Sequence, residues 1–360
     1  MPPARSIQLL LKMTDRCNMR CSYCSDRPFR EHPSTITPQV IAGLPRIFGL
    51  LAQRFAEIDV IFHGGEPFCT PPSRFAEVFS ALGHYKPFYS AQTNLYDLRL
   101  PAHANILARL RSLSITLDGP RQLHDAHRLD RHREGTFDRI LNNLSRLRTE
   151  YPSLQIGALF TVSSDSVAFA HDIYHLFREL RIRHIGFNPV VSGPDSLSPQ
   201  DYLAFLKELF ALWSADPDPL DVHLFSEAAK YFTGLQATPS TCHGPDCYRN
   251  IISVSPAGHI NPCMHWHDDS HFTVDTLTNL DDYWAYYADK MSNRFLAADC
   301  PDCDFLHFCR GGCPHEYSHK RWLCCPAIKA FLNHTAAYFT DQLKIAIRVE
   351  SQCRVTGQPL

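Results

Sequence analysis

The sequence predicts an α/β protein, an open partial (β/α)6 barrel followed by a cysteine-rich C-terminal module, on three observations. Short apolar runs alternate with amphipathic stretches through the first half of the chain, a pattern typical of βαβ units with a parallel sheet. There are six such runs, fewer than the eight strands of a closed barrel. The 14 cysteines gather near the start of the chain and after residue 240.

Each expected element follows from its periodicity. The expected strands cover residues 7–13, 58–62, 88–92, 113–117, 156–162 and 184–189. Helical spacing of apolar residues appears at 38–55, 72–82, 137–148, 168–180 and 200–215. A hairpin is expected at 250–261 and a closing helix at 327–349. The loop composition of 192–199 marks a boundary, so we place a barrel at 1–195, a connecting helical segment at 196–240 and the cysteine-rich module at 241–360.

Composition excludes several classes of protein. The formal net charge of −2 gives no electrostatic case for a nucleic-acid partner. No apolar run approaches the roughly 18 residues of a membrane span, and the N-terminus lacks a signal peptide. We therefore expect a cytoplasmic protein in a reducing compartment, where disulfides are rare. In that setting clustered cysteines indicate metal or redox chemistry.

The first cysteine group, Cys17, Cys21 and Cys24, forms a CxxxCxxC motif directly after the first expected strand. Three thiolates can hold three irons of a [4Fe–4S] cluster and leave the fourth iron without a protein ligand. An open position on a metal can bind a substrate or cofactor. A zinc site and chance spacing are the alternatives. The place of the motif, at the carboxyl end of a barrel strand, favours an active site.

This motif, with Tyr23 before its third cysteine, resembles that of the radical S-adenosylmethionine (radical SAM) superfamily. The second strand ends in Gly-Gly-Glu-Pro, similar to the family's GGEP motif, and the fourth reads Ser-Ile-Thr-Leu-Asp-Gly-Pro, similar to its S-(I/L)-S-(L/M)-D-G-P motif. The resemblance implies a bound S-adenosylmethionine, with Arg128 on its carboxylate because an arginine fork suits that group. Taken separately, the Gly-Gly-Glu-Pro sequence is also typical of an ordinary turn, and Arg128 could equally form a surface salt bridge. The implied cofactor-binding residues are Tyr23, Gly64, Gly65, Glu66, Asn94, Thr116, Asp118, Arg128, Asn188 and Val190.

The C-terminal cysteines resemble the SPASM extension of radical SAM enzymes that modify peptides and proteins. The pattern here is C-x15-G-x4-C, then C-x2-C-x5-C-x3-C, then a final cysteine. The resemblance implies two auxiliary [4Fe–4S] clusters, three clusters in all. The implied ligands are Cys242, Cys247, Cys263 and Cys313 for auxiliary cluster I, and Cys300, Cys303, Cys309 and Cys324 for auxiliary cluster II. Cys325 is the alternative final ligand, and zinc ribbons are the alternative to clusters.

The resemblance implies an oxidoreductase that cleaves S-adenosylmethionine to a 5′-deoxyadenosyl radical and abstracts a hydrogen from its substrate. We expect a maturase of a ribosomally made precursor peptide that forms a C–C or C–S crosslink, with a flavodoxin or ferredoxin as reductant. Because the first strand starts near residue 7, we expect the barrel or the module to recognise the peptide leader. No catalytic base is assigned.

Three other functions remain open. Sulfatase maturases, which make formylglycine, carry an aspartate where this sequence has Met264, and methionine cannot take a proton. A radical enzyme acting on a small molecule is the second. A non-catalytic zinc or iron–sulfur protein is the third, although a structural site would normally complete three cysteines with a fourth ligand.

Overall fold

The computed structural model describes residues 6–26, 33–235, 247–266, 269–292, 297–313, 315–318 and 321–356. Within these residues a sheet of ten strands runs in the order β10-β9-β8-β1-β2-β3-β4-β5-β6-β7. The six expected barrel strands all form, and each pairs in parallel with the next. Their bounds are Ser6–Thr14 (β1), Glu57–Gly64 (β2), Phe88–Thr93 (β3), Ser112–Thr116 (β4), Gln155–Val162 (β5) and His184–Pro189 (β6). A two-residue strand, β7 (Asp221–Val222), continues the parallel order.

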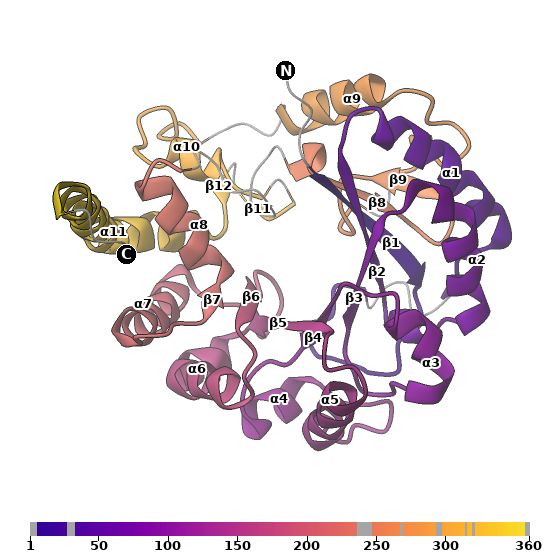
Figure 1. The fold of residues 1–360 in the computed structure, drawn as a ribbon, viewed down its shortest axis with the longest axis horizontal. Helices are drawn as coiled ribbons and strands as arrows, with labels where there is room; N and C mark the ends of the chain where they lie inside the picture. Colours follow the sequence, from indigo (N-terminus) through magenta and orange to yellow (C-terminus); the bar gives the residue numbers. More distant parts are fainter. Residues whose placement is uncertain are drawn as a thin grey trace.

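Helices cover the outer face of the curved sheet (Figure 1). The expected helices form as α1 (Pro38–Ala52), α2 (Pro72–Leu82), α5 (Phe137–Glu150), α6 (Ala170–Glu179) and α7 (Pro199–Ala215). The structure adds α3 (Leu100–Leu107), α4 (Arg121–His127) and α8 (His223–Phe232). Of these, α3 and α4 are short, so each offers too few turns for a periodic pattern to be read from sequence. None of the described helices is both long enough and apolar enough to span a bilayer.

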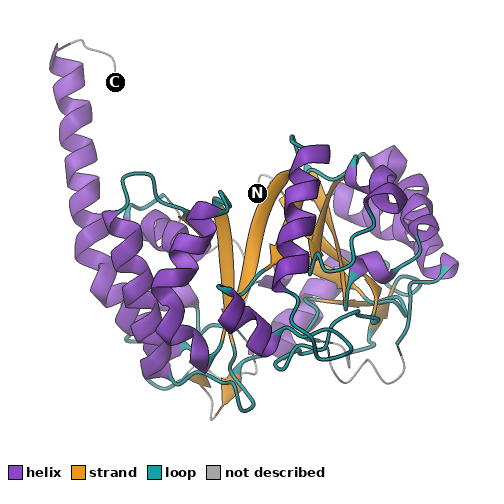
Figure 2. Ribbon diagram, turned by 90° about the horizontal axis from the view of Figure 1, so that it is seen from below, coloured by secondary structure: helices purple, strands orange, loops and turns teal. Residues whose placement is uncertain are grey.

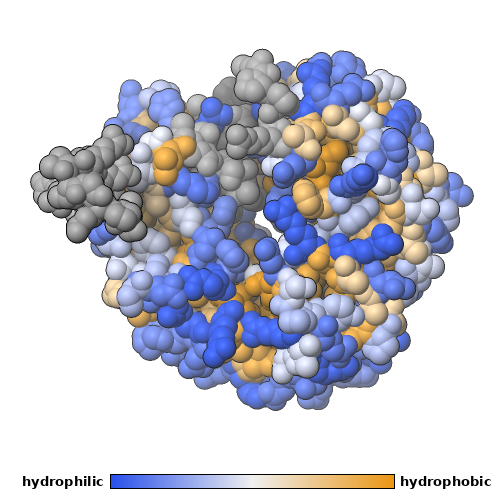
Figure 3. Space-filling model, in the orientation of Figure 1, coloured by the Kyte–Doolittle hydropathy of each residue, from blue (hydrophilic) through white to orange (hydrophobic). Residues whose placement is uncertain are grey.

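The two faces of the sheet have different chemistry. In β1, Leu9, Leu11 and Met13 are fully buried against the helices, as alternation along a strand requires. The opposite, inner face carries many polar side chains that bond across strands, such as Gln92 Nε2 to Thr116 Oγ1 at 2.9 Å. Figure 3 shows mostly hydrophilic residues around the hollow at the centre of the molecule. The barrel therefore encloses a polar site rather than an apolar core.

The C-terminal module continues the barrel sheet, which its cysteine pattern did not predict. The expected hairpin forms from β8 (Ile251–Val254) and β9 (His259–Asn261). Its first strand pairs in parallel with β1, with Leu9 opposite Ile252, and β10 (Phe272–Thr273) follows β9. This pairing covers the edge of β1, which would otherwise expose unpaired backbone groups.

The closing helix lies on the other side of the opening. Helix α11 (Cys325–Thr356) contacts α7 and α8, with Phe331 5.7 Å from Phe210 and 5.3 Å from Phe225 between ring centroids. Its C-terminal part projects beyond the body of the protein (Figure 2). Between the hairpin and α11 lie α9 (Leu280–Ser292), α10 (Leu306–Cys309) and the small hairpin of β11 (Tyr317–Ser318) and β12 (Arg321–Trp322). Residues of the module thus border both edges of the open barrel.

Candidate functional site

The first cysteine motif lies on the loop that follows β1, here called the cysteine loop (residues 15–26). It is held by backbone pairing with residues 127–130, at the end of α4 and directly after it. Arg20 N donates to Leu129 O at 2.7 Å, and Ser22 N donates to His127 O at 3.0 Å. Cys21 is buried, while Cys17 and Cys24 are half-buried. A segment about a hundred positions away therefore shapes the loop that presents the three thiols.

A buried lysine joins the two ends of the cysteine loop. Lys12, in β1, is 2% exposed. Its Nζ lies 2.9 Å from Asp15 Oδ1 and 3.3 Å from Asp26 Oδ2. A buried ammonium is stable only when carboxylates pair with it, so these two aspartates are drawn together. Sequence reasoning missed this group, although a lysine inside the apolar run of residues 7–13 was the signal.

The glycines at the end of β2 make room for the start of this loop. A Cβ on Gly64 would lie 2.4 Å from Thr14 O, and a Cβ on Gly65 would lie 2.5 Å from Arg16 O. The backbones also bond, Gly65 N to Thr14 O at 2.8 Å. The resemblance implied that these glycines bind the cofactor. The structure adds a reason within the chain, since any side chain here would displace the loop.

Glu66 is buried and its carboxylate is already engaged by the protein. It accepts hydrogen bonds from Thr93 Oγ1 and Asn94 N, each at 2.8 Å, and from Phe68 N at 3.1 Å. Burial raises the pKa of Glu66 to about 7, against the opposing effect of these three bonds. The carboxylate therefore ties β2 to β3 and positions Asn94. The Asn94 side-chain amide lies 3.7 Å from Cys17 Sγ.

Arg128 lies beside the thiols and not on the surface. Its Nε donates to Asp118 Oδ2 at 2.5 Å, and Tyr23 OH donates to the same oxygen. Its Nη1 lies 3.7 Å from Cys21 Sγ. Burial disfavours the charge, but Asp118 and the thiols of Cys21 and Cys24 keep the pKa of Arg128 above its usual value. A fixed positive charge therefore faces two of the three thiols.

The remaining predicted cofactor residues lie farther along the same carboxyl edge of the sheet. Thr116 ends β4. Asn188 is exposed on β6 beside Thr161 of β5, and Arg128 Nη2 donates to Thr161 Oγ1 at 3.2 Å. Val190 is buried, with its amide bonded to Val162 O at 2.9 Å. The edge thus brings every one of the ten predicted cofactor-binding residues to one side of the barrel.

Sequence reasoning did not assign a role to His127, the residue before Arg128. Its Nδ1 is 2.9 Å from Ser22 Oγ, and its Nε2 is 3.2 Å from Asp165 Oδ2. Ser22 Oγ also donates to Asp195 Oδ2 at 2.6 Å. His127 therefore links the cysteine loop to the loops after β5 and β6.

The predicted ligands of auxiliary cluster I are only partly visible. Cys242 lies outside the described residues. Cys263 follows β9, and Cys313 lies four residues after the end of α10. Burial, with a smaller contribution from the charge of Cys313, raises the pKa of Cys263 to about 12. Cys247 and Cys263 both act electrostatically on buried Tyr283, so these three cysteines lie in one neighbourhood.

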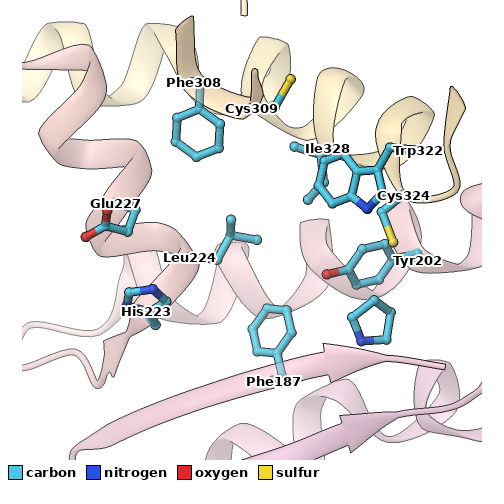
Figure 4. A pocket seen from close by; sticks show the side chains of 11 residues that line it. Phe187, Tyr202, His223, Leu224, Glu227, Phe308, Cys309, Trp322, Cys324 and Ile328 are labelled. Carbon is cyan, nitrogen blue, oxygen red and sulfur yellow. The ribbon is translucent and has the colours of Figure 1, made fainter. Parts of the chain in front are cut away.

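Four other cysteines of the module line a small pocket, here called the thiol pocket. Its thiols belong to Cys300, Cys303, Cys309 and Cys325. Cys324, the predicted fourth ligand, is absent from this lining. It lines instead a larger apolar pocket, in which its sulfur lies beside Tyr202 (Figure 4). The sulfur of Cys309 points away from that apolar pocket in the same view. Among the described residues, no three histidine, cysteine or acidic side chains converge to hold a single metal ion.

Comparison with known proteins identifies the barrel. The model of the radical SAM superfamily matches residues 11–173. These residues are a radical SAM domain. Such a domain works with an iron–sulfur cluster and S-adenosylmethionine, and this chain's residues fit that pair. The fit rests on three thiols on one loop, with the buried Arg128 guanidinium beside Cys21.

Proteins similar over most of the chain include sulfatase-maturating enzymes. The cysteine-type anaerobic enzyme of Clostridium novyi is 26% identical in an alignment of 351 residues that covers 86% of this chain and 88% of that protein. The serine-type anaerobic enzyme of Bacteroides thetaiotaomicron is 19% identical in an alignment of 355 residues that covers 87% of this chain and 84% of that protein. A solved structure of native anSMEcpe with bound AdoMet and Cp18Cys peptide superposes with a TM-score of 0.79, covering 95% of this chain and 99% of that one at 19% identity. This last likeness shows that the chain shares that fold beyond its radical SAM domain.

Proposed function

We propose that this chain is a radical SAM enzyme that oxidises a residue of a peptide or protein, in the manner of the sulfatase-maturating enzymes. One observation carries the proposal. The similarity to those enzymes extends over 86% of this chain and includes the cysteine-rich module. A radical SAM enzyme of unrelated substrate would be expected to share the barrel alone, because function depends on the groups added to a fold.

Within this proposal the cysteine loop holds the cluster that carries the chemistry. The cluster and S-adenosylmethionine, when bound, supply a carbon radical that removes a hydrogen atom from the substrate. Cys17, Cys21 and Cys24 are the ligands, with Arg128 opposing the negative charge of their thiolates. Thr116 and Asn188, at the rim of the polar inner face, offer hydrogen bonds to S-adenosylmethionine. Asp118 keeps the Arg128 head in place through the 2.5 Å bond.

The module would complete the oxidation. Converting a C–H and an S–H or O–H of the substrate to a double bond removes two electrons and two protons. One electron leaves with the abstracted hydrogen atom, so the other needs an acceptor. We assign this role to auxiliary iron–sulfur sites at the two cysteine groups of a SPASM module. The first group is Cys242, Cys247, Cys263 and Cys313. Fully ligated clusters suit electron transfer.

Met264 favours a second candidate, a maturase that crosslinks a ribosomally made precursor peptide. Sulfatase maturases carry an aspartate at the position that Met264 occupies here. The thioether of Met264 cannot accept a proton as that carboxylate could. Asp269, the acidic residue next along the described chain, is paired with Lys290 Nζ at 2.7 Å. That pairing lowers the pKa of Asp269 although burial opposes the shift, so this carboxylate is a weak proton acceptor.

Peptides that differ at one residue distinguish the two candidates. The enzyme, reconstituted without oxygen, is incubated with S-adenosylmethionine, a chemical reductant and a sulfatase-derived peptide bearing cysteine, serine or alanine at the target position. We expect the cysteine peptide to lose its sulfur and gain an aldehyde by mass spectrometry, while the alanine peptide is unchanged. A peptide that loses hydrogen and keeps its sulfur would support crosslinking. S-adenosylmethionine cleavage with every peptide unchanged would contradict the maturase proposal. Flavodoxin or ferredoxin replaces the reductant in a second series, as the proposed physiological partner.

A further inference from the structure

Two adjacent cysteines, Cys324 and Cys325, lie at the N-terminus of α11 and face different surroundings. Cys325, the first residue of the helix, lines the thiol pocket with Cys300, Cys303 and Cys309. Cys324 lines the apolar pocket with Tyr202. Consecutive residues at a helix start point in directions about 100° apart, so one cysteine can face the pocket while its neighbour faces away. We propose that Cys325, and not Cys324, is the fourth thiolate of the site formed by Cys300, Cys303 and Cys309.

A tryptophan separates the two cysteines. Trp322 is 4% exposed and lines both pockets. A Cβ on Gly312 would lie 2.1 Å from the Trp322 ring, so the indole rests directly on the backbone of that glycine. Trp322 Nε1 also donates to Glu316 Oε2 at 2.9 Å. Because both the face and the edge of the ring are fixed, Cys324 would have to displace Trp322 to reach the thiol pocket.

The nearby charges favour the same assignment. Arg321 lines the thiol pocket and hydrogen-bonds Cys325, while its Nη2 is held by Asp299 Oδ1 at 2.6 Å. Cys324 instead has Glu316 and the thiols of Cys313 and Cys325 near it. An arginine therefore lies beside Cys325, with Asp299 as its partner, while the charged residue near Cys324 is a carboxylate. Cys324 is then a buried small apolar residue, the usual role of a free cysteine.

Iron content of two single variants tests the assignment, which rests on the proposed function in that the thiol pocket holds an iron–sulfur cluster. The full chain is reconstituted anaerobically as wild type, Cys325→Ala and Cys324→Ala, and iron and sulfide are counted per chain. We expect Cys325→Ala to lose about four iron atoms, one cluster's worth, and Cys324→Ala to match the wild type. The two variants remove the same atoms from neighbouring positions, so each controls for the other.

Several results would overturn the assignment. Loss of iron from Cys324→Ala with none from Cys325→Ala would restore the order implied by resemblance, and equal loss or no loss in both variants would also contradict the proposal. If Cys325→Ala does not fold, Cys325→Ser serves instead, since a serine oxygen can replace the thiolate. In that variant we expect a changed electron paramagnetic resonance signal at unchanged circular dichroism, and an unchanged signal would refute the assignment.

The readout separates this inference from the proposed function. No substrate is added, so a chain that loads iron as expected but modifies no peptide would refute the proposed function alone. Zinc in place of iron in the module would refute the cluster assignment. Zinc content of the same variants would then decide the fourth ligand, with Cys325→Ala again expected to show the loss.

Discussion

The cysteine loop and the thiol pocket each bring several thiols together, but they do so by different structural means. The three thiols of the loop come from eight consecutive residues after one strand. Buried charges hold them, Lys12 at the two ends of the loop and Arg128 beside Cys21. The thiols of the pocket come from a turn, a short helix and the start of α11. The charged residue there, Arg321, is 43% exposed in its side chain, against 10% for Arg128. A local motif is therefore backed by a buried polar network, while a dispersed site depends on how its elements pack.

The largest effect should come from removing the loop's thiols. A Cys17/Cys21/Cys24→Ala variant is expected to lose S-adenosylmethionine cleavage and to fall from about twelve iron atoms per chain to about eight. Release of 5′-deoxyadenosine and iron content are the measurements. Cys325→Ala is the matched case and should keep substrate-free cleavage, because its site lies outside the radical SAM domain. Loss of cleavage in both variants would show that the two regions are not independent.

The two arginines beside the thiols should differ in their effect on stability. Arg128→Met leaves the buried carboxylate of Asp118 unpaired, and breaking such a pair costs about 3–5 kcal/mol. Arg321→Met breaks an exposed pair with Asp299, which is worth roughly 0–1 kcal/mol. The free energy of unfolding, from urea titration of the unloaded proteins, gives both values. Similar losses for the two variants would contradict the distinction drawn between buried and exposed charges.

A glycine substitution should affect the loop without touching its ligands. Gly65→Ala places a Cβ 2.5 Å from Arg16 O, and we expect a loss of about 1–3 kcal/mol in unfolding free energy from this overpacking. Iron retained by the radical SAM domain should fall with it. Gly83→Ala is the control, because a Cβ there has no neighbour within 4 Å. Normal iron content in Gly65→Ala would mean that the loop can move aside.

The smallest effect concerns pH and Glu66. Its pKa rises on folding from 4.5 to about 7, so the folded state binds a proton more tightly than the unfolded state. The stability from this group is therefore complete below pH 4.5 and is lost as the pH rises through about 7. Glu66→Gln should remove this part of the slope when unfolding is followed across that range. The variant also replaces one acceptor oxygen by an NH2 group, so either Asn94 N or the pair of Thr93 Oγ1 and Phe68 N loses its acceptor, which lowers stability at every pH. An unchanged slope would show that another group is responsible.

The radical SAM half of the molecule follows closely from its sequence. All six barrel strands were predicted, with ends that moved by no more than two residues. The three cysteines and the glycine pair were found from short-range spacing, because local residues determine each turn. Roles that depend on partners were not found. Lys12, for example, appears in sequence only as a polar residue in an apolar strand, and Asp26 is fourteen positions away.

In the C-terminal module, two features could not be predicted from the sequence. Spacing and resemblance pointed to the cysteines that line the thiol pocket up to Cys309, but they implied Cys324 as the final ligand, with Cys325 as the alternative. Their difference depends on the direction in which α11 starts and on Trp322, which separates the pockets. Nor did the sequence show that β8 would pair with β1, because strand pairing across about 240 positions is set by which edges meet.

The amino-acid sequence by itself determined the strands, the cysteine motif and the enzyme class, since these depend on periodicity and on spacing within a few residues. Only the tertiary structure decided which charges are buried, how the module extends the sheet of the open barrel and which of two neighbouring cysteines lines the thiol pocket. The physical reason is that burial and direction belong to packed elements, and distant segments must meet before either exists.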